Sequence, residues 1–403
     1  MRHGNSERIQ TYSCGTNGTS GQNVHAPLLG SLLILPIQAI GDSIPMTTHE
    51  IFFDSAQTMR DVENESVDLV VTSPPYPMIE MWDEILGSQN AKISSAFEEK
   101  DYTQVFEFMH MELDRVWKEC YRVLKGGGIA CINIGDATRT LDKNFMLYSN
   151  HARIISCCLS LGFQNLPNII WRKQTNAPNK FMGSGMLPPG AYVTLEHEII
   201  LNFRKGRKRE FKTPEQKLNR YHSSYFWEER NSWFSDLWDL KGTHQTLLGK
   251  TSRQRSAAYP FELAYRLVNM FSVQGDIILD PFLGTGTTIL AAMASNRCSL
   301  GFEIDPALSK TINSSIVEKE SFLNSVIEQR FLKHLTFAEE KKKLKGESYF
   351  KHFNEYYDFP VMTSQETKIR IPYIDNIRPC DSGFQTAYLD EIRLTPPDSL
   401  GLK

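Results

Sequence analysis

Four adjacent residues of this chain could take part in binding or catalysis: Ser73, Pro74, Pro75 and Tyr76. The preceding residues 66–72 are mostly apolar and β-branched, which predicts a buried strand. The four residues therefore follow the carboxyl end of a strand, where open α/β sheets bind their ligands. A hydroxyl and proline-flanked carbonyls can accept hydrogen bonds, and the tyrosine ring offers a flat face. Together they would form a socket for an amino group on a planar base, although a proline-rich turn after a core strand would look the same.

A second segment that could bind a ligand lies about two hundred residues later. Residues 276–279 predict a short buried strand, residues 280–288 (DPFLGTGTT) a glycine turn, and residues 289–295 a helix. The next strand, residues 299–304, carries Glu303 near its end. Glycines permit a tight turn and close approach of the backbone to a ligand, and an acid at this distance typically binds ribose hydroxyls. A glycine turn alone could be ordinary, but the four features together predict a nucleoside-binding site.

The glycine spacing narrows the choice of nucleoside. The loop contains GTG rather than GxGxxG, and no Gly-Lys-Ser/Thr follows it, so it lacks the fingerprints for a pyrophosphate or a triphosphate. The string from Asp280 to Thr288 closely resembles the S-adenosylmethionine loop of DNA methyltransferases. The resemblance therefore implies S-adenosyl-L-methionine as the cofactor.

That resemblance also implies roles for individual residues. Asp280 and the backbone of Gly284 and Gly286 would hold the methionine part of the cofactor. Glu303 would bind the ribose, and Phe282 would line the pocket. The loop residues assigned to cofactor binding are Asp280, Pro281, Phe282, Gly284, Gly286, Thr287 and Thr288.

The order of the two motifs is informative, because the Ser-Pro-Pro-Tyr motif precedes the cofactor loop. This order resembles the circularly permuted beta group of DNA amino-methyltransferases, and the Ser-Pro-Pro-Tyr form is the one usual for cytosine-N4 enzymes. That group begins with a strand ending in an acid that contacts the cofactor adenine, and residues 49–54 fit with Asp54 as the acid. A turn or helix-capping aspartate would fit Asp54 equally well.

The resemblance covers residues 46–318 and implies an α/β fold. We expect a Rossmann-like S-adenosylmethionine-dependent methyltransferase domain with a permuted motif order and an inserted target-recognition region at 179–254. Residues 1–45 match nothing in the family, and Met46 directly precedes the family-like start, so we expect a disordered extension there. Residues 319–403 predict a helical and then β-like extension to which the sequence assigns no role.

A basic stretch falls inside the expected recognition region. Residues 204–220 carry eight Lys/Arg against two Glu, and aromatic residues follow. Cations beside aromatics suit phosphate contact and base stacking. Lys205, Arg207, Lys208 and Arg209 are the predicted phosphate contacts, with a solvated charged loop as the alternative.

Composition limits the other classes of function. The net charge of −3 over 403 residues argues against a globally basic coat, so nucleic-acid contact must be local. Seven cysteines occur without a CxxC pair or zinc-ligand spacing, which suits a reducing cytoplasm. No apolar run approaches the length of a membrane span. We therefore expect a cytoplasmic prokaryotic protein without a membrane or metal site.

The resemblance implies a site-specific DNA methyltransferase that modifies the N4 amine of cytosine in a restriction–modification system. The target base must be flipped out of the duplex. Ser73 Oγ and the Pro74 carbonyl would accept the two amine hydrogens, and Tyr76 would stack on the ring, so direct attack needs neither a covalent intermediate nor a metal. The expected partner is double-stranded DNA with a short specific site; a cognate restriction endonuclease and a homodimer stay open.

Three other activities compete with this interpretation. Carbon-5 methylation needs a cysteine nucleophile after proline, and the only such pair, Pro379-Cys380, lies in the tail without the rest of that pattern. Adenine-N6 methylation is the closer alternative, although its motif usually starts with Asp or Asn rather than with Ser73. The third is a regulator that binds cofactor and DNA without turnover.

Overall fold

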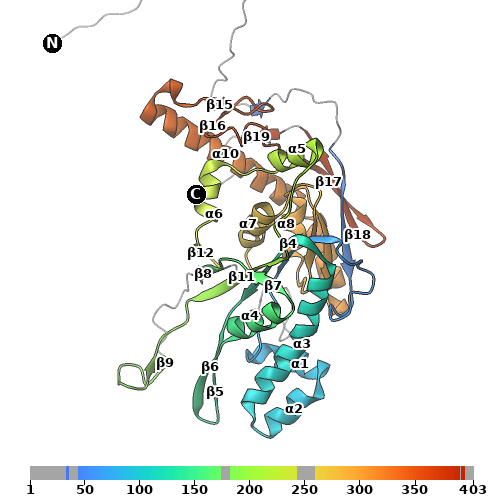
Figure 1. The fold of residues 1–403 in the computed structure, drawn as a ribbon, viewed down its shortest axis with the longest axis vertical. Coiled ribbons are helices and arrows are strands. Elements are labelled where there is room, and N and C mark those ends of the chain that lie inside the picture. The colour runs from blue at the N-terminus through green and yellow to red at the C-terminus, as the bar shows by residue number, and fades with distance from the viewer. Residues whose placement is uncertain (1–32, 36–43, 174–181, 243–258, 391, 395–403) are drawn as a thin grey trace, which may run out of the picture. The chain divides into compact units, whose positions relative to one another are not determined.

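The computed structural model describes residues 33–35, 44–173, 182–242, 259–390 and 392–394 (Figure 1). Nearly all of them belong to the compact unit formed by residues 34–394. Of the expected extension at 1–45, only β1 (Leu33–Leu35) and residues 44–45 are described, so its disorder stays a prediction.

The centre of this unit is a sheet that has eleven strands in the described part of the chain. Its order is β12-β8-β11-β4-β3-β13-β14-β2-β18-β17, with β7 also paired to β11. The five strands from β4 to β2 are parallel, whereas β11 is antiparallel to β4 and β8. The bounds are β2 (Thr47–Phe52), β3 (Val67–Thr72), β4 (Leu124–Ile134), β7 (Phe163–Asn165), β8 (Ile169–Lys173), β11 (His197–Lys205), β12 (Leu237–Leu240), β13 (Ile277–Asp280), β14 (Cys298–Phe302), β17 (Tyr373–Cys380) and β18 (Gly383–Leu389). The predicted α/β fold is confirmed.

Central parallel strands need apolar side chains on both faces, and the sequence supplies them. All six residues of β3 are buried. Parallel strands covered on both sides read as continuous Val/Ile/Leu runs rather than as alternating patterns. Figure 1 shows α3 (Tyr102–Val123) and α4 (Asn150–Ser160) on one side of the sheet and α7 (Phe261–Phe271) and α8 (Thr287–Met293) on the other. The sheet is thus the core layer of an α/β sandwich.

The chain connections define where a ligand can bind. From β3 the chain passes through α3 to its neighbour β4, and from β13 it passes through α8 to its neighbour β14. Because β3 and β13 are adjacent, the two connections leave in opposite directions. Such a switch point leaves a crevice at the carboxyl ends of the strands, and ligands of α/β sheets bind there.

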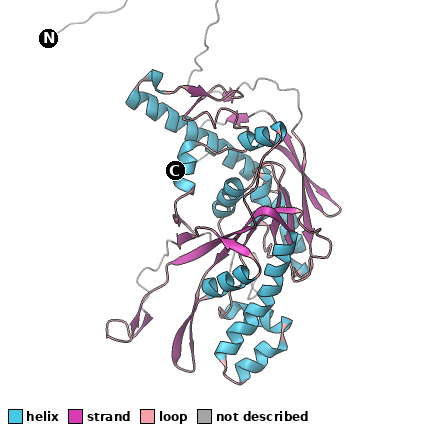
Figure 2. Cartoon of the chain, viewed as in Figure 1, coloured by secondary structure: helices cyan, strands magenta, loops and turns pink. Residues whose placement is uncertain are grey.

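The remaining helices and hairpins surround the sheet (Figure 2). Within the described residues, no helix combines the length and the apolar composition needed to cross a bilayer. The further elements are η1 (Glu80–Trp82), α1 (Asp83–Gln89), α2 (Ala91–Glu98), β5 (Ala137–Leu141), β6 (Asn144–Tyr148), β9 (Met182–Gly183), β10 (Ala191–Tyr192), α5 (Pro214–His222), α6 (Trp227–Trp233), η3 (Pro306–Leu308), α9 (Ser309–Val317), α10 (Glu320–Lys345), η4 (Glu347–Tyr349), β15 (His352–Phe353), β16 (Pro360–Val361) and β19 (Ile392–Leu394).

The interval 179–254 differs from the sequence-based expectation of one inserted region. It supplies β11, which lies between β4 and β8, and β12 at the sheet edge. Residues 200–203 of β11 are buried. Part of the interval is therefore core sheet, and a region set apart for reading DNA stays a prediction.

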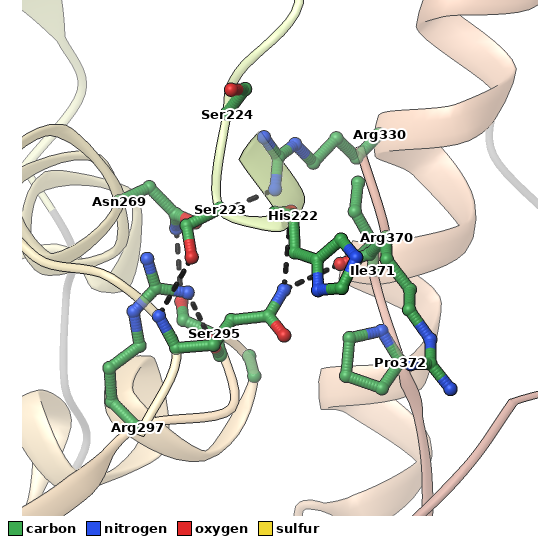
Figure 3. Close-up of a pocket in the computed structure, with 12 residues that line it drawn as sticks. His222, Ser223, Ser224, Asn269, Ser295, Arg297, Arg330, Arg370, Ile371 and Pro372 are labelled. Carbon is green, nitrogen blue, oxygen red and sulfur yellow. Dashed lines mark hydrogen bonds between the residues drawn. The ribbon is translucent and has the colours of Figure 1, made fainter. Parts of the chain in front are cut away.

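The C-terminal residues pack on the central sheet and on α6. Strand β18 pairs antiparallel with β2 and so extends the central sheet. On α10, the Arg330 guanidinium lies 2.6 Å from Glu229 of α6, and both side chains are nearly buried. Figure 3 shows Arg330 beside Arg297 and Arg370 around a polar cavity. Its volume of about 10 Å³ is about the space of one water molecule, so it cannot hold a nucleoside.

We predict that Arg330→Met lowers the free energy of unfolding by about 3–5 kcal/mol, because it leaves the Glu229 carboxylate buried without its partner. Methionine keeps most of the side-chain volume, so the loss reports the charge. Urea denaturation measures the free energy of unfolding of each variant. The control Lys342→Met breaks only the more exposed pairs with Glu339 and Glu347 and should cost less than about 1 kcal/mol. Equal losses in the two variants would contradict a special role for the buried pair.

Candidate active site at the switch of the sheet

A buried carboxylate joins the two segments that the sequence singled out. Asp280, 2% exposed at the end of β13, accepts hydrogen bonds from Thr72 Oγ1 at 2.6 Å, Tyr259 OH at 3.2 Å and the Phe282 amide at 3.0 Å. The Thr288 hydroxyl is a fourth donor. Burial raises the pKa of Asp280 while these hydrogen bonds oppose the rise. The carboxylate thus fixes the end of β3, the start of α8 and Tyr259 against the end of β13.

The cofactor loop owes its shape to two glycines. Gly284 has a φ of 56° and Gly286 a φ of 88°, the left-handed region that disfavours side chains. Gly286 is also the N-cap of α8. Glu303 Oε2 accepts from the Gly284 amide at 3.0 Å, and Oε1 accepts from the Asp305 amide at 2.8 Å. The acid that was expected to bind ribose therefore also braces the glycine turn.

Asp54, the acid expected to contact adenine, follows β2. It lies at the same edge of the sheet as Glu303, because β2 is the neighbour of β14. The Glu303 amide donates to the Phe52 carbonyl at 2.9 Å, and the rings of Phe52 and Phe302 stack with centroids 4.8 Å apart. Asp54 follows β2, is exposed, and accepts from the Ser55 amide at 2.6 Å. Both the adenine contact of Asp54 and its alternative as a turn or helix-capping aspartate stay predictions.

The residues of this edge fit a nucleoside cofactor. Gly284 and Gly286 themselves carry no side chains that would block approach to their backbone. The Glu303 carboxylate accepts only, as binding of ribose hydroxyls requires. Phe282 packs edge-on against Trp117 with ring centroids 5.9 Å apart, and it supplies an apolar wall. The cofactor-binding roles assigned to the residues of this loop and to Glu303 all stay predictions. The Thr288 hydroxyl is already bonded to Asp280.

The Ser-Pro-Pro-Tyr motif lies on the other side of the switch point, directly after Thr72. The Ser73 and Tyr76 hydroxyls are 3.1 Å apart, and Pro74 is buried whereas Pro75 is partly exposed. Burial, followed by the nearby Glu198 carboxylate, raises the pKa of Tyr76 well above its ordinary value, so its hydroxyl stays protonated.

Glycine at position 135 leaves room for the Tyr76 ring. A Cβ added to Gly135 would lie 3.0 Å from Tyr76 Cε2 and 3.2 Å from Glu198 Cγ. Both distances are tight for carbon contacts. A side chain at position 135 would therefore require Tyr76 or Glu198 to shift by a few tenths of an ångström.

Sequence reasoning missed several residues of this site. They are Thr72, which binds Asp280, Asn133 and Glu198, which contact Tyr76, and Lys173, which binds Glu198. Only Glu198 carried a local signal. A charged residue stands there among the apolar positions of a strand, and buried charges need partners.

The predicted phosphate contacts lie at the opposite edge of the sheet. Arg209 bonds to Asp276 at 2.6 Å and lies 3.4 Å from Asp68, while Lys205 Nζ donates to the Leu124 carbonyl at 2.8 Å. These partners stand at or before the starts of the parallel strands. A Cβ on Gly127 would touch the Arg209 backbone. Gly127 precedes Asn133 by six residues on β4, a span of about 20 Å along a strand.

Lys205 and Arg209 therefore bond to groups of the fold. Of the four predicted contacts, Arg207 and Lys208 have exposed side chains that form no ion pair within the part of the chain that the structure describes. The DNA role of the four residues stays a prediction that their placement does not support.

Known proteins resemble this chain. Residues 67–314 match a family model described as DNA methylase, of the N6/N4 type. M.MthZI, a type II methyltransferase of Methanothermobacter thermautotrophicus, is 51% identical over 329 residues, which cover 81% of this chain and 91% of that protein. M.MjaI, a type II methyltransferase of Methanocaldococcus jannaschii, is 50% identical over 290 residues, which cover 69% and 94%.

A solved structure resembles the chain as well. TTHA0409, named a DNA modification methylase of Thermus thermophilus and crystallised with S-adenosyl-L-methionine, is 32% identical. The TM-score is 0.52, and the match covers 68% of this chain and 96% of the other.

We predict that Glu303→Ala weakens binding of S-adenosyl-L-methionine by about 10- to 100-fold, because hydrogen bonds to a charged group contribute about 1.5–3 kcal/mol. Isothermal titration calorimetry measures this. Glu318→Ala removes an exposed acid outside the loop and serves as the matched control. An unchanged affinity in Glu303→Ala would rule out the ribose role.

We predict that the double variant Arg207→Ala/Lys208→Ala keeps the salt dependence of DNA binding. Two lost phosphate contacts would lower the slope of log affinity against log salt by about two, but both residues lie at the edge away from Ser73. Fluorescence anisotropy with duplex DNA measures the slope. Lys343→Ala/Lys345→Ala removes the same charge elsewhere and is the control. A slope reduced by about two in the first variant alone would establish the phosphate contacts.

Proposed function

Because this chain belongs to the DNA methylase family of the N6/N4 type, we propose that it methylates the N4 amine of cytosine at a short specific site in double-stranded DNA. The chain is a DNA methyltransferase, and its cofactor is S-adenosyl-L-methionine. The bound cofactor supplies an electrophilic methyl group. The choice of cytosine rests on one observation: the first residue of the catalytic motif at the switch point is a serine.

The exocyclic amine of cytosine is a poor nucleophile, since its lone pair is conjugated into the ring. Ser73 Oγ and the Pro74 carbonyl accept hydrogen bonds from the two amine hydrogens, which draws the nitrogen toward a tetrahedral form and frees the lone pair. When the nitrogen gains the methyl group, it releases one of these hydrogens as a proton to water. The Tyr76 ring stacks on the flipped base. Fixing the amine in line with the methyl group supplies most of the acceleration. No residue of the chain needs to form a covalent bond to the base.

The permuted motif order is part of the proposal. The catalytic motif follows β3 and the cofactor loop follows β13, and these adjacent strands are far apart in sequence. The strand that ends near Asp54, β2, lies beside β14 although it precedes β3 in the chain. This arrangement supports assignment to the permuted group.

We further propose that the protein is the modification enzyme of a prokaryotic restriction–modification system and acts in the cytoplasm. The two archaeal relatives, each named a type II methyltransferase, support this role. A cognate restriction endonuclease and a homodimer stay predictions. Adenine-N6 methylation is the second candidate, since the matched family covers both kinds of amine.

We predict that tritium from labelled cofactor appears in N4-methylcytosine when the wild-type protein acts on unmethylated DNA. Ser73→Ala should lower the rate by about 100-fold or more, the cost of removing one group that stabilises a transition state, with unchanged cofactor affinity. Ser88→Ala, an exposed serine on α1, is the control. Nucleoside analysis reads the base directly.

Two results would contradict the proposal. N6-methyladenine as the product would overturn the choice of cytosine and leave the fold, cofactor and motif in place. Undiminished transfer by Ser73→Ala would remove the hydroxyl from the mechanism.

A further inference from the structure

A polar network behind the catalytic motif is not accounted for by the motif itself. Its centre is Glu198, 8% exposed at the start of β11. Glu198 Oε2 accepts from Tyr76 OH at 2.8 Å and from Asn133 Nδ2 at 2.7 Å. The Lys173 ammonium donates to Oε1. Because β11 runs antiparallel to β4, its first residues lie at the carboxyl edge, beside Ser73.

The chemistry of these groups fixes the direction of every hydrogen bond. A carboxylate only accepts, so the single proton of the Tyr76 hydroxyl points at Glu198. The amide edge of Asn133 that faces Glu198 must be its NH₂ for the same reason. That NH₂ also donates to Tyr76 OH at 2.9 Å. The Tyr76 oxygen is therefore an acceptor toward all its other neighbours.

The Tyr76 hydroxyl in turn orients the hydroxyl proton of Ser73. Ser73 Oγ lies 3.1 Å from the Tyr76 oxygen, and since that oxygen accepts, Ser73 donates its only proton there. The lone pairs of Ser73 Oγ then remain for another donor. A contact from Asn133 Nδ2 to Ser73 Oγ is 3.4 Å and is the longest of the set. A hydroxyl that could donate or accept is thereby made an acceptor.

We propose that Glu198, supported by Asn133 and Lys173, is a positioning residue for methyl transfer: it orients the Tyr76 and Ser73 hydroxyl protons so that Ser73 Oγ accepts a hydrogen of the target amine. This proposal rests on the proposed function, since it requires an amine as the substrate group. It adds three residues, on β4, β8 and β11, to the two hydroxyls of the motif.

Lys173 allows the carboxylate to stay charged in this place. A buried carboxylate without a counter-charge is costly, and removing one partner of such a pair exposes that cost. The Lys173 side chain is 39% exposed, and its ammonium also lies 4.7 Å from the centre of the Trp171 ring. It can therefore compensate Glu198 from the protein surface and turn to water when Glu198 is replaced.

The test is Glu198→Gln in a single-turnover assay with enzyme in excess over DNA. The glutamine amide donates as well as accepts, so it no longer imposes one direction on the two hydroxyls. We expect the rate constant to fall by about 10- to 100-fold, as for loss of hydrogen bonds to a charged group. Cofactor affinity and the midpoint of thermal unfolding should match the wild type. Glu196→Gln, an exposed acid two residues earlier, is the control.

A second variant separates positioning from mere packing. Tyr76→Phe removes the hydroxyl through which Glu198 acts. In that background, Glu198→Gln should change the rate by less than about twofold, because coupled residues are not additive. A Glu198 that only supported the fold would lower the rate equally in both backgrounds, and that result would overturn the proposal. A wild-type rate in Glu198→Gln alone would overturn it as well.

The wild-type product distinguishes this inference from the proposed function. N6-methyladenine would overturn the choice of cytosine, while the ratio of the Glu198→Gln rate to the wild-type rate would still decide the role of Glu198. N4-methylcytosine with no effect of Glu198→Gln would retain the function and reject the positioning role.

Discussion

The arrangement of the active site depends on the buried carboxylate of Asp280. Strands β3 and β13 share only two residue pairs in register, and the hydrogen bond between Thr72 and Asp280 joins positions 208 residues apart. Thr72 immediately precedes Ser73 of the proposed catalytic motif, and the Phe282 amide belongs to the proposed cofactor loop. A charge at this depth is tolerated only when several donors satisfy it. The same requirement that makes Asp280 costly to bury therefore holds catalytic motif and cofactor loop at a fixed separation.

The two edges of the sheet use charge for different purposes. At the carboxyl edge, Glu198 and Glu303 accept hydrogen bonds from groups that surround the ligand sites. At the amino edge, Arg209 bonds to Asp276, and Lys125 bonds to Asp68 at 2.7 Å. These pairs satisfy acids at the starts of β13 and β3. A basic run in a sequence therefore does not by itself indicate a phosphate-binding surface, because acids elsewhere in the fold compete for the same cations.

Sequence reasoning succeeded where the signal is local. A strand, a glycine turn and a helix in succession predict the loop around Gly284, and prolines after an apolar run predict the end of β3. It failed where a residue's role is set by distant partners. Strand β11 follows β4 only after intervening helix, strand and hairpin segments, and nothing near Glu198 indicates that Tyr76 will contact it. The sequence suggested that Arg209 is a free cation, because its partner Asp276 lies 67 residues later. Pairings of this kind depend on the topology of the sheet, which short patterns do not contain.

The network behind Tyr76 also explains what a serine in the motif requires. An aspartate in that position would accept hydrogen bonds in any orientation, because an ionised carboxylate has no proton to give. A serine hydroxyl can donate or accept, and with its proton turned toward the amine it would oppose the reaction. Its direction must therefore be imposed by a neighbour. Tyr76 can impose it only if its own proton is already taken, and the acceptor must be a group that never donates. Glu198 meets that condition, so the choice of serine at 73 and the buried acid at 198 are two parts of one requirement.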